Sequence, residues 1–510
     1  MPVHVEQASR LFCATWIRVA GLPHRHDRRD AHLTLALLLV AQGARPVSRE
    51  SQRDKLFSRR SVIIRSSHLT LYPSMLFGVP RLIKTLLVFS VFACLGLGLV
   101  SCSSYNSGSR GSTRSGLKFR AFVSNPINPV QSGGGVPVLN IMDASKDALS
   151  FYTVSLFGSV PDVGMMVESP KRDRTVVLSP SNNALAIVNN SLESVERNMT
   201  LPGATDSFFV WTDNTTAFVA VPSASVTGQT SLGAVERVDI SSGAITATVA
   251  IPGAHFLVSS PDGSKILVIS DSTNEVTVLD PNLVTTGNPL TPVTGAFDKP
   301  VGAVFSADGS KAFVLNCGPE CGGIAASISV INMDTSSFAG SAIPIPGGAT
   351  VALLQGTNLF VAGTPIAPAN DCTGASPATA ATSCGRLTVV DTSALAAGTP
   401  VPITDGFHNH MHMGATGQLF IGSRNCTNIN SPGSEVRGCL SIANTATGGV
   451  VVPPANGNVT GIEPIPNRDV VYVCEGGALR IYDTTTDQLQ TNPEQPNIVG
   501  QAIDVKVVDF

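Results

Sequence analysis

The chain alternates short apolar segments with polar turns over most of its length. From about residue 118 to the C terminus, short runs rich in Val, Ile, Phe and Thr are bounded by turns rich in Gly, Asp and Asn. Such runs predict β-strands joined as hairpins. In segments such as 259–282 and 305–335, a turn leads into one strand, a polar loop follows, and a second strand ends in Asp or Asn. Because further strands often precede and follow, the pattern predicts units of four antiparallel strands.

These units repeat every 40–60 residues or so, and the repeat predicts the fold. The clearest copies are 259–282, 305–335, 354–393, 415–448 and 465–487, and weaker copies are 120–145, 174–190 and 215–243. Four-stranded units in series are typical of β-propeller blades, which bury their faces by stacking around an axis. We therefore predict an all-β fold, a β-propeller of eight four-stranded antiparallel blades, with seven blades as the alternative. The alternative folds for the same pattern are a linear array of the units or two stacked β-sandwiches.

The two ends of the repeat region predict how the ring closes. Residues 503–510 form an alternating strand with no hairpin partner after it, and the first unit, which begins at Lys118, lacks a first strand of its own. We expect the C-terminal strand to complete the first blade. This pairing would remove an exposed sheet edge.

One repeat motif resembles a known family. The segment SPDGSKILVIS…VTVLD, with Asp262-Gly263 and its counterpart Asp308-Gly309, resembles the YVTN-type β-propeller repeat of surface-layer and lactonase-like propellers. The Tyr-Val-Thr-Asn strand itself is present only in altered forms such as AFVSN, AFVLN and VYVCE. The resemblance covers about 118–510 and implies a fold more than a function, because propellers support many activities.

An apolar segment upstream of the repeats indicates export. Arg81 and Lys84 precede an uncharged run from Leu86 to Val100, the layout of a secretory signal peptide. The run is short for a membrane-spanning helix, which is the alternative. Leu99-Val100-Ser101-Cys102 resembles the lipobox of bacterial lipoproteins. The resemblance implies cleavage before Cys102, lipidation of its thiol and anchoring by acyl chains. Since Ser and no Asp follows the cysteine, it favours the outer membrane.

The resulting domain plan has four parts. Residues 75–101 are the expected signal peptide, 102–117 a flexible Ser/Gly linker and 118–510 the propeller. Residues 1–74 carry 12 Lys/Arg and 5 Asp/Glu and should not precede a signal peptide. We interpret them as a mis-annotated or disordered extension, with translation beginning at Met75; a genuine basic extension is the alternative.

The charge of the mature chain limits its partners. From Cys102 onward there are 19 Lys/Arg and 31 Asp/Glu, a net charge near −12, whereas the whole chain carries only −3. A chain of this charge without a basic patch is not expected to bind nucleic acid. We expect contact with the membrane through the lipid anchor.

Six of the seven cysteines after Cys102 fall into local pairs. The pairs are Cys317 with Cys321, Cys372 with Cys384, and Cys426 with Cys439. Each pair lies between the second and third strands of its unit, in three consecutive units. Because an exported protein meets an oxidising compartment, we expect three disulfides; a zinc site at Cys317 and Cys321 is the alternative. Cys474 is left over on an apolar strand, where a buried, inert thiol is expected.

Three of the four histidines of the mature chain lie together in GFHNHMHMG. His408, His410 and His412 alternate, so on a regular strand they would share one face. Their position predicts the first strand of a unit, which lines the central channel of a propeller. Polar residues in a wet channel are one interpretation. A site for zinc or for copper, which Met411 and Met413 would suit, is another, and a catalytic base is the third. No other cofactor is implied.

No motif of nucleophilic, nucleotide-binding or zinc-protease catalysis is present. Asp239, Asp280, Asp391 and Asp483 recur at the ends of third strands, which predicts turn acceptors and not an acid–base pair. We expect a non-catalytic cell-envelope lipoprotein whose propeller binds an envelope protein or a polysaccharide. The alternative is an extracytoplasmic enzyme, lactonase-like or a metal-dependent oxidoreductase, with its site near His408–His412.

Overall fold

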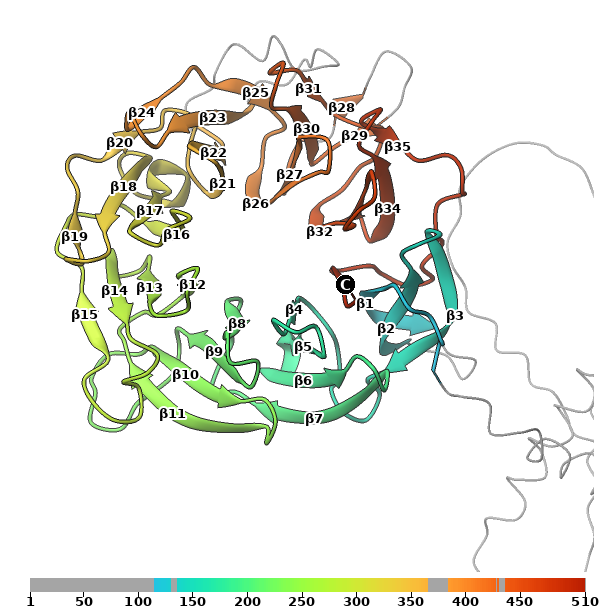
Figure 1. Cartoon of the computed structure of the whole chain (residues 1–510), viewed down its shortest axis with the longest axis horizontal. Coiled ribbons are helices and arrows are strands. Elements are labelled where there is room, and N and C mark those ends of the chain that lie inside the picture. Colours follow the sequence, from blue (N-terminus) through green and yellow to red (C-terminus); the bar gives the residue numbers. More distant parts are fainter. Residues whose placement is uncertain (1–113, 130–134, 366–383, 428, 431–435, 510) are drawn as a thin grey trace, which may run out of the picture. The chain divides into compact units, whose positions relative to one another are not determined.

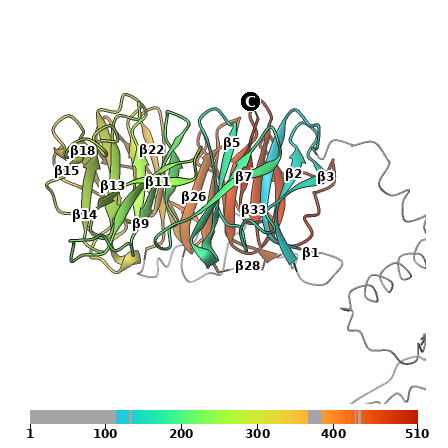
Figure 2. The ribbon, with the colours of Figure 1, turned by 90° about the horizontal axis from the view of Figure 1, so that it is seen from below.

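Eight antiparallel sheets surround a central axis and form a β-propeller (Figure 1). The computed structural model describes residues 114–129, 135–365, 384–427, 429–430 and 436–509. Seen from the side, many strands run roughly along the axis, whereas the outermost strand β7 (Ser194–Thr200) crosses obliquely (Figure 2). The expected signal peptide, most of the expected linker, Cys102, and residues 1–74 lie outside the described residues. Within the described residues, no helix has the length and apolar character needed to cross a membrane.

Each of blades 1 to 4 contains four strands, which follow one another from the axis outward. Blade 1 contains β36 (Val505–Val507), β1 (Arg120–Pro129), β2 (Gly135–Asp143) and β3 (Ala148–Ser155). Blade 2 contains β4 (Met166–Glu168), β5 (Arg174–Ser179), β6 (Ala184–Asn189) and β7 (Ser194–Thr200). Blade 3 contains β8 (Phe208–Val210), β9 (Thr216–Val221), β10 (Ala234–Asp239) and β11 (Ala244–Ala250). Blade 4 contains β12 (Phe256–Ser259), β13 (Ile266–Ser270), β14 (Glu275–Leu279) and β15 (Leu290–Pro292).

Blades 5 to 8 follow the same plan with small additions at the outer edge. Blade 5 contains β16 (Pro300–Phe305), β17 (Lys311–Asn316), β18 (Ser327–Asn332), β19 (Ser337–Phe338) and β20 (Ile343–Pro344). Blade 6 contains β21 (Val351–Gln355), β22 (Asn358–Gly363), β23 (Gly385–Asp391), β24 (Ala396–Ala397) and β25 (Val401–Ile403). Blade 7 contains β26 (Phe407–Met413), β27 (Gln418–Arg424), β30 (Leu440–Asn444) and β31 (Val450–Val451), and the hairpin of β28 (Ile429–Asn430) and β29 (Val436–Arg437) lies between β27 and β30. Blade 8 contains β32 (Val459–Pro464), β33 (Val470–Glu475), β34 (Ala478–Asp483) and β35 (Gln488–Leu489).

The hydrophobic core lies between neighbouring blades. Second strands such as β9 (TAFVAV) and β13 (ILVIS) are buried at every residue, because both faces of each sheet pack on a neighbour. Outermost strands such as β11 (AITATVA) are mostly exposed. Each buried cluster joins adjacent sheets, as where the residues of blades 2 and 3 pack together around Leu185 and Val219. The blades therefore depend on each other for burial.

Aspartates terminate the third strands as the sequence predicts. Asp239 Oδ1 accepts the backbone N–H of Ser241 at 2.8 Å, and Asp391 Oδ1 accepts that of Ser393 at 2.8 Å. Asp280 and Asp483 accept N–H groups in the same way. These short polar loops satisfy backbone donors locally, which confirms the structural role of these carboxylates.

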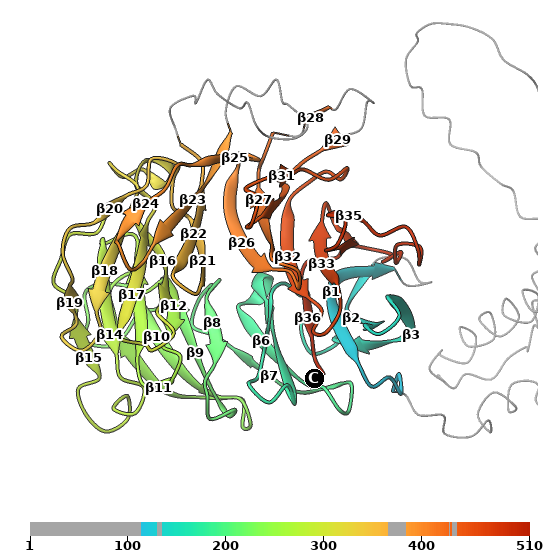
Figure 3. The same ribbon diagram turned by 45° about the horizontal axis from the view of Figure 1, so that its top comes forward.

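The ring closes between its two ends, as predicted. Strand β36 pairs with β1 in antiparallel register, with Phe122 opposite Lys506, and completes blade 1 from the inside (Figure 3). Arg120 reinforces the joint: its Nε and Nη2 donate to Asp509 at 2.7 Å each, and its Nη1 donates to Glu193 Oε1 at 2.7 Å. The eight-blade count and the closure by the last strand are both confirmed.

We expect Arg120→Met to lower the free energy of unfolding by about 3 kcal/mol, because it leaves the buried Glu193 carboxylate without a positively charged partner. Denaturant unfolding followed by circular dichroism measures this loss. Arg174→Met is the matched control, since its ion pairs with Asp173 and Glu196 are more exposed, and it should cost less than about 1 kcal/mol. Equal effects of the two variants would show that the joint is not specially dependent on Arg120.

Candidate functional site

The innermost strands divide the axis into two halves of different chemistry. In blades 3 to 6 these strands are β8, β12, β16 and β21, and they carry no charged residue. In blades 7, 8, 1 and 2 they are β26, β32, β36 and β4, and they carry the three histidines, Glu463, Lys506 and Glu168. Titratable side chains therefore gather on four adjacent blades, on both sides of the closing strand.

The histidines lie on the innermost strand of blade 7, as predicted, but they do not share one face. His408 pairs with Ser423 and His410 with Gly422, so a β-bulge inserts Asn409 between them. Because one extra residue reverses which face a side chain occupies, His408 lies on the face opposite to His410. The predicted one-face arrangement of His408, His410 and His412 is wrong for this reason.

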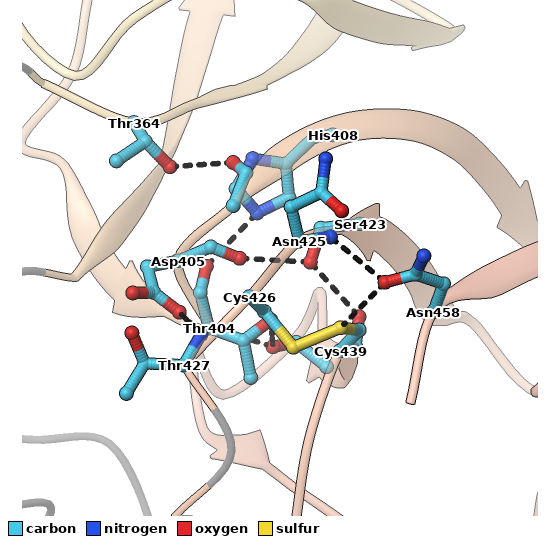
Figure 4. Close-up of a disulfide and its surroundings, with 12 residues drawn as sticks. Thr364, Thr404, Asp405, His408, Ser423, Asn425, Cys426, Thr427, Cys439 and Asn458 are labelled. Atoms are coloured by element: carbon cyan, nitrogen blue, oxygen red, sulfur yellow. Dashed lines mark hydrogen bonds between the residues drawn. A yellow bond between two sulfur atoms is a disulfide. The ribbon is translucent and has the colours of Figure 1, made fainter. Parts of the chain in front are cut away.

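His408 is a buried structural residue next to blade 6. Its Nε2–H donates to the carbonyl of Thr404 at 2.9 Å (Figure 4), and the ring is fully buried. A Cβ at Gly385 of β23 would lie 2.6 Å from the ring, so a glycine there makes room for it. Burial lowers the pKa of His408 to about 4, since the charged form has lost its water. The imidazole is therefore neutral at pH 7.

His410 and His412 occupy the other face of β26, opposite Met411, which packs in the core between blades 6 and 7. Both rings are half-buried. Burial, followed by the nearby positive charge of Lys506, lowers the pKa of His410 to about 3 and that of His412 to about 4. Each ring is neutral at pH 7 and offers one donor and one acceptor nitrogen.

The closing strand brings a lysine into contact with carboxylates. Lys506 Nζ lies 3.3 Å from Asp504 Oδ1 and 3.9 Å from Glu463 Oε2. Burial alone would lower the pKa of Lys506, but Asp504 and Glu463 outweigh it and raise the pKa. The other oxygen of Asp504, Oδ2, accepts the backbone N–H of Met166 at 2.7 Å. Lys506 therefore stays charged and links blade 8 to the closing segment, while Asp504 links that segment to blade 2.

Glu168 is the carboxyl group whose acidity is most changed at the axis. It accepts hydrogen bonds from Thr175 Oγ1 at 3.1 Å and from Asn190 Nδ2 at 3.3 Å. Burial, with a contribution from the negative charge of Glu463, raises its pKa to about 8. A carboxyl group that keeps its proton at neutral pH can act as an acid or donate a hydrogen bond.

A metal centre does not emerge from these residues. Among the side chains that the structure describes, no group of three or more His, Cys, Asp or Glu is placed to hold a metal ion. The bulge at Asn409 explains why the three histidines do not form one ligand set, since it places His408 on the face opposite to His410 and His412. The structure thus gives no support to zinc or copper on the three histidines.

Two of the three predicted disulfides lie within the described residues. Cys317 bonds to Cys321 and Cys426 to Cys439, so the zinc alternative at Cys317 and Cys321 does not apply. Cys384 is disulfide-bonded, whereas Cys372 lies outside the described residues. The two complete pairs belong to the loops between the second and third strands of blades 5 and 7, and we call the described residues of these loops, 317–326, 425–427 and 436–439, the stapled loops. Cys474 is a buried free thiol, as expected.

Hydrogen bonds fix the stapled loops to neighbouring segments. In blade 5, Asp298 Oδ2 accepts the N–H groups of Ile324 and Ala325 at 2.6 Å each. In blade 7, Asp405 Oδ1 accepts the N–H of Thr427 at 2.7 Å (Figure 4). Asp298 and Asp405 each lie just before the innermost strand of their blade. The stapled loops therefore lie at the end of the ring where the innermost strands begin.

Further bonds join these loops from blade to blade. Thr364 of blade 6 donates its N–H to Glu320 Oε2 of blade 5 at 2.9 Å and its hydroxyl to the carbonyl of Gly406 of blade 7 at 2.8 Å. The N–H of Asn425 donates to Asn458 Oδ1, which precedes blade 8, at 2.8 Å. Burial raises the pKa of Glu320 to about 7. Four consecutive blades thus share one connected rim.

The comparisons with known proteins show the fold. No family model matches the chain, and no curated protein matches it in sequence. Among solved structures, the chain is similar to dihydro-heme d1 dehydrogenase NirN in complex with DHE, at 12% identity and a TM-score of 0.54, covering 79% of this chain and 77% of that one. It also matches Kuenenia stuttgartiensis hydrazine synthase, at 15% identity and a TM-score of 0.47, over 63% of this chain and 95% of that one. The likeness to NirN supports the fold alone and says nothing about ligands or chemistry.

Sequence reasoning missed Glu168, Glu463, Asp504 and Lys506. Each is a charge in or beside an apolar strand, and Glu168 lies about 300 residues before the other three along the chain. The sequence did contain one indication of this cluster. Lys506 stands between two valines in the closing strand, and a lysine on a strand at the axis is rarely buried unless an opposite charge lies beside it. The partners themselves could be identified only once the ring was closed.

Glu168→Gln should change how stability depends on pH. In wild type, the unfolded chain ionises Glu168 near pH 4.5 while the folded protein keeps the proton up to about pH 8, so this group lowers stability as pH rises between these values. The glutamine variant lacks the effect and should gain on the order of 2 kcal/mol relative to wild type between pH 4 and pH 8.

Denaturant unfolding at pH 4 and pH 8 measures this difference. Glu275→Gln, at an exposed glutamate of β14, is the control and should track wild type. A Glu168→Gln variant that also tracks wild type at both values of pH would contradict the raised pKa of the Glu168 carboxyl group.

Proposed function

We propose that this protein is a cell-envelope lipoprotein whose propeller binds a partner, an envelope protein or a polysaccharide, without catalysis. The observation that carries the proposal is the connected rim of blades 5 to 8, where two disulfides and inter-blade hydrogen bonds fix the stapled loops. Fixed loops lose little conformational freedom on binding, so more of the contact energy appears as affinity. A rigid rim is what a recognition surface requires.

The stapled loop of blade 5 presents an apolar side chain on this rim. Ile324 is 89% exposed, although the backbone N–H of the same residue is held by Asp298. An exposed aliphatic group on a fixed backbone has no role in the core. It suits a contact that becomes buried when a partner binds.

The proposed envelope location is inferred from the expected signal peptide, and the disulfides are consistent with it. Stable disulfides are typical of oxidising compartments. The expected signal peptide and the lipobox resemblance at Cys102 supply the route and the anchor. The net charge near −12 of the mature chain fits neither nucleic acid nor a polyanionic partner.

Ile324→Asp should weaken partner binding by about tenfold or more if the rim is the binding surface. The measurement compares cross-linked partners recovered from detergent-solubilised envelope, and binding to purified cell-wall polysaccharide, for the full-length variants. Ile245→Asp, at a partly exposed isoleucine on the outer strand of blade 3, is the matched control and should retain binding. Cys426→Ser with Cys439→Ser should weaken binding through loss of loop order.

These assays contradict the proposal if wild type recovers no partner and binds no polysaccharide. They also contradict it if the variants at positions 324 and 245 bind alike, because the rim would then not be the surface used.

A second candidate function is an extracytoplasmic, lactonase-like hydrolase at the axis. The observation that favours it is the grouping of neutral His410 and His412 with the protonated Glu168 and the ion-paired Lys506 on four adjacent blades. Neutral imidazoles can accept a proton and a protonated carboxyl group can donate one.

A panel of lactones tests this candidate. His410→Gln with His412→Gln should lower the rate of hydrolysis by about 100-fold, whereas His408→Gln, at the buried ring that packs against blade 6, should affect folding and leave turnover per folded molecule unchanged. Absence of hydrolysis by wild type, or equal rates in wild type and the 410/412 variant, would exclude the imidazoles as catalytic groups for lactones.

A further inference from the structure

Exposed aromatic side chains are concentrated on one blade. Among the described residues twelve large hydrophobic side chains are exposed, and the three aromatic ones, Phe151, Tyr152 and Phe157, all belong to blade 1. Phe151 is 96% exposed and Phe157 is 72% exposed. They lie on β3 and the turn that follows it, together with the exposed Leu149. We call these four residues the aromatic patch.

A β-bulge presents the patch to solvent. Leu149 pairs with Met142 and Thr153 pairs with Asn140, so three residues of β3 stand opposite one residue of β2. The three include Phe151 and Tyr152, whose rings pack edge to face at 5.8 Å. A bulge redirects side chains out of the regular ladder. The arrangement therefore holds two aromatic rings outside the sheet in place of burying them.

The same bulge argues against a strand as the partner. A sheet edge recruits another strand through a regular row of free backbone groups. Ser150, Phe151 and Tyr152 interrupt that row in the outermost strand of blade 1. Beside Phe157 lies an open pocket of about 320 Å³, lined partly by Pro137, Val160 and Pro161. The surface thus presents aromatic rings, prolines and a shallow depression, and few regularly spaced backbone groups with which another strand could pair.

The place where the chain enters the propeller points to the occupant. Residue 114, the first described residue, lies twelve positions after Cys102, so an extended chain between them spans at most about 40 Å. Ser115 donates its hydroxyl and its N–H to Glu193 in blade 2, and β1 of blade 1 begins at Arg120. A lipid anchor at Cys102 would therefore keep blade 1 close to a bilayer.

We propose that the aromatic patch is a membrane-contact surface that enters the interfacial region of a phospholipid bilayer when the protein is anchored at Cys102. This inference rests on the anchor in the proposed function. Aromatic rings favour the boundary between headgroups and acyl chains, and a second contact supplements the anchor. Blade 5, with its stapled loop, lies across the ring from blade 1 (Figure 1). The contact thus holds the stapled loop of blade 5, with Ile324, on the side of the ring away from the membrane.

Depth-dependent quenching in membranes tests the proposal. The full-length lipidated protein with Phe151→Trp is placed in phosphatidylethanolamine vesicles that contain phosphatidylcholine brominated on its acyl chains, and the signal of wild type is subtracted. With the ring about 5–10 Å into the interface, fluorescence from position 151 should fall by about half. Ile245→Trp on β11 of blade 3 is the matched control and should not be quenched.

The outcomes separate the two proposals. Co-flotation with the vesicles that is lost in Cys102→Ser supports the anchor. If wild type floats but Trp at position 151 is quenched no more than Trp at position 245, the membrane contact is overturned and the anchor stands. If wild type does not float, the anchor and the contact are both overturned.

Discussion

The pairing of β36 with β1 is the constraint on which the rest of the structure depends. Each blade buries both faces of its sheet only against its neighbours, and the middle strands are apolar throughout. An open ring would expose the inner faces of blades 1 and 8 and two unpaired edges. Strand β36 prevents this exposure by pairing three of its residues with β1, and Arg120 of β1 forms an ion pair with Asp509, just after β36. Blade 8 contributes as well, since Arg468 and Tyr472 bind Asp147 of blade 1.

The same joint creates the titratable half of the axis. Lys506 and Asp504 belong to the closing segment, Glu463 to the blade before it and Glu168 to the blade after it. Charges that have lost part of their water need partners. Lys506 has Asp504 and Glu463, and Asp504 also accepts the backbone N–H of Met166 from blade 2. Closure therefore fixes both the fold and the protonation states near His410 and His412. The stapled loops belong to the connections between the second and third strands, so the proposed binding rim is formed by other residues than the titratable half of the axis.

Much of the architecture could be predicted because its causes are local. Strand alternation, Asp turns such as that at Asp391 and the spacing of the cysteines each depend on a few neighbouring residues. The bulges could not be predicted in this way. At Asn409 one extra residue turns His408 toward Gly385 and Thr404, and at Ser150–Tyr152 three residues leave the ladder. Both bulges depend on contacts with the neighbouring strand or blade, and the alternation of apolar and polar residues along the sequence does not indicate such contacts.

Hydrogen exchange measures the central claim most directly. If closure supports the whole ring, backbone amides of residues 503–508 and 120–124 should exchange together with those of the most protected strands, such as β9 and β33, at the rate of global unfolding. Exchange of residues 503–508 that is orders of magnitude faster than in β9 would show that the ring persists with its joint open. That result would contradict the account of both the fold and the axis.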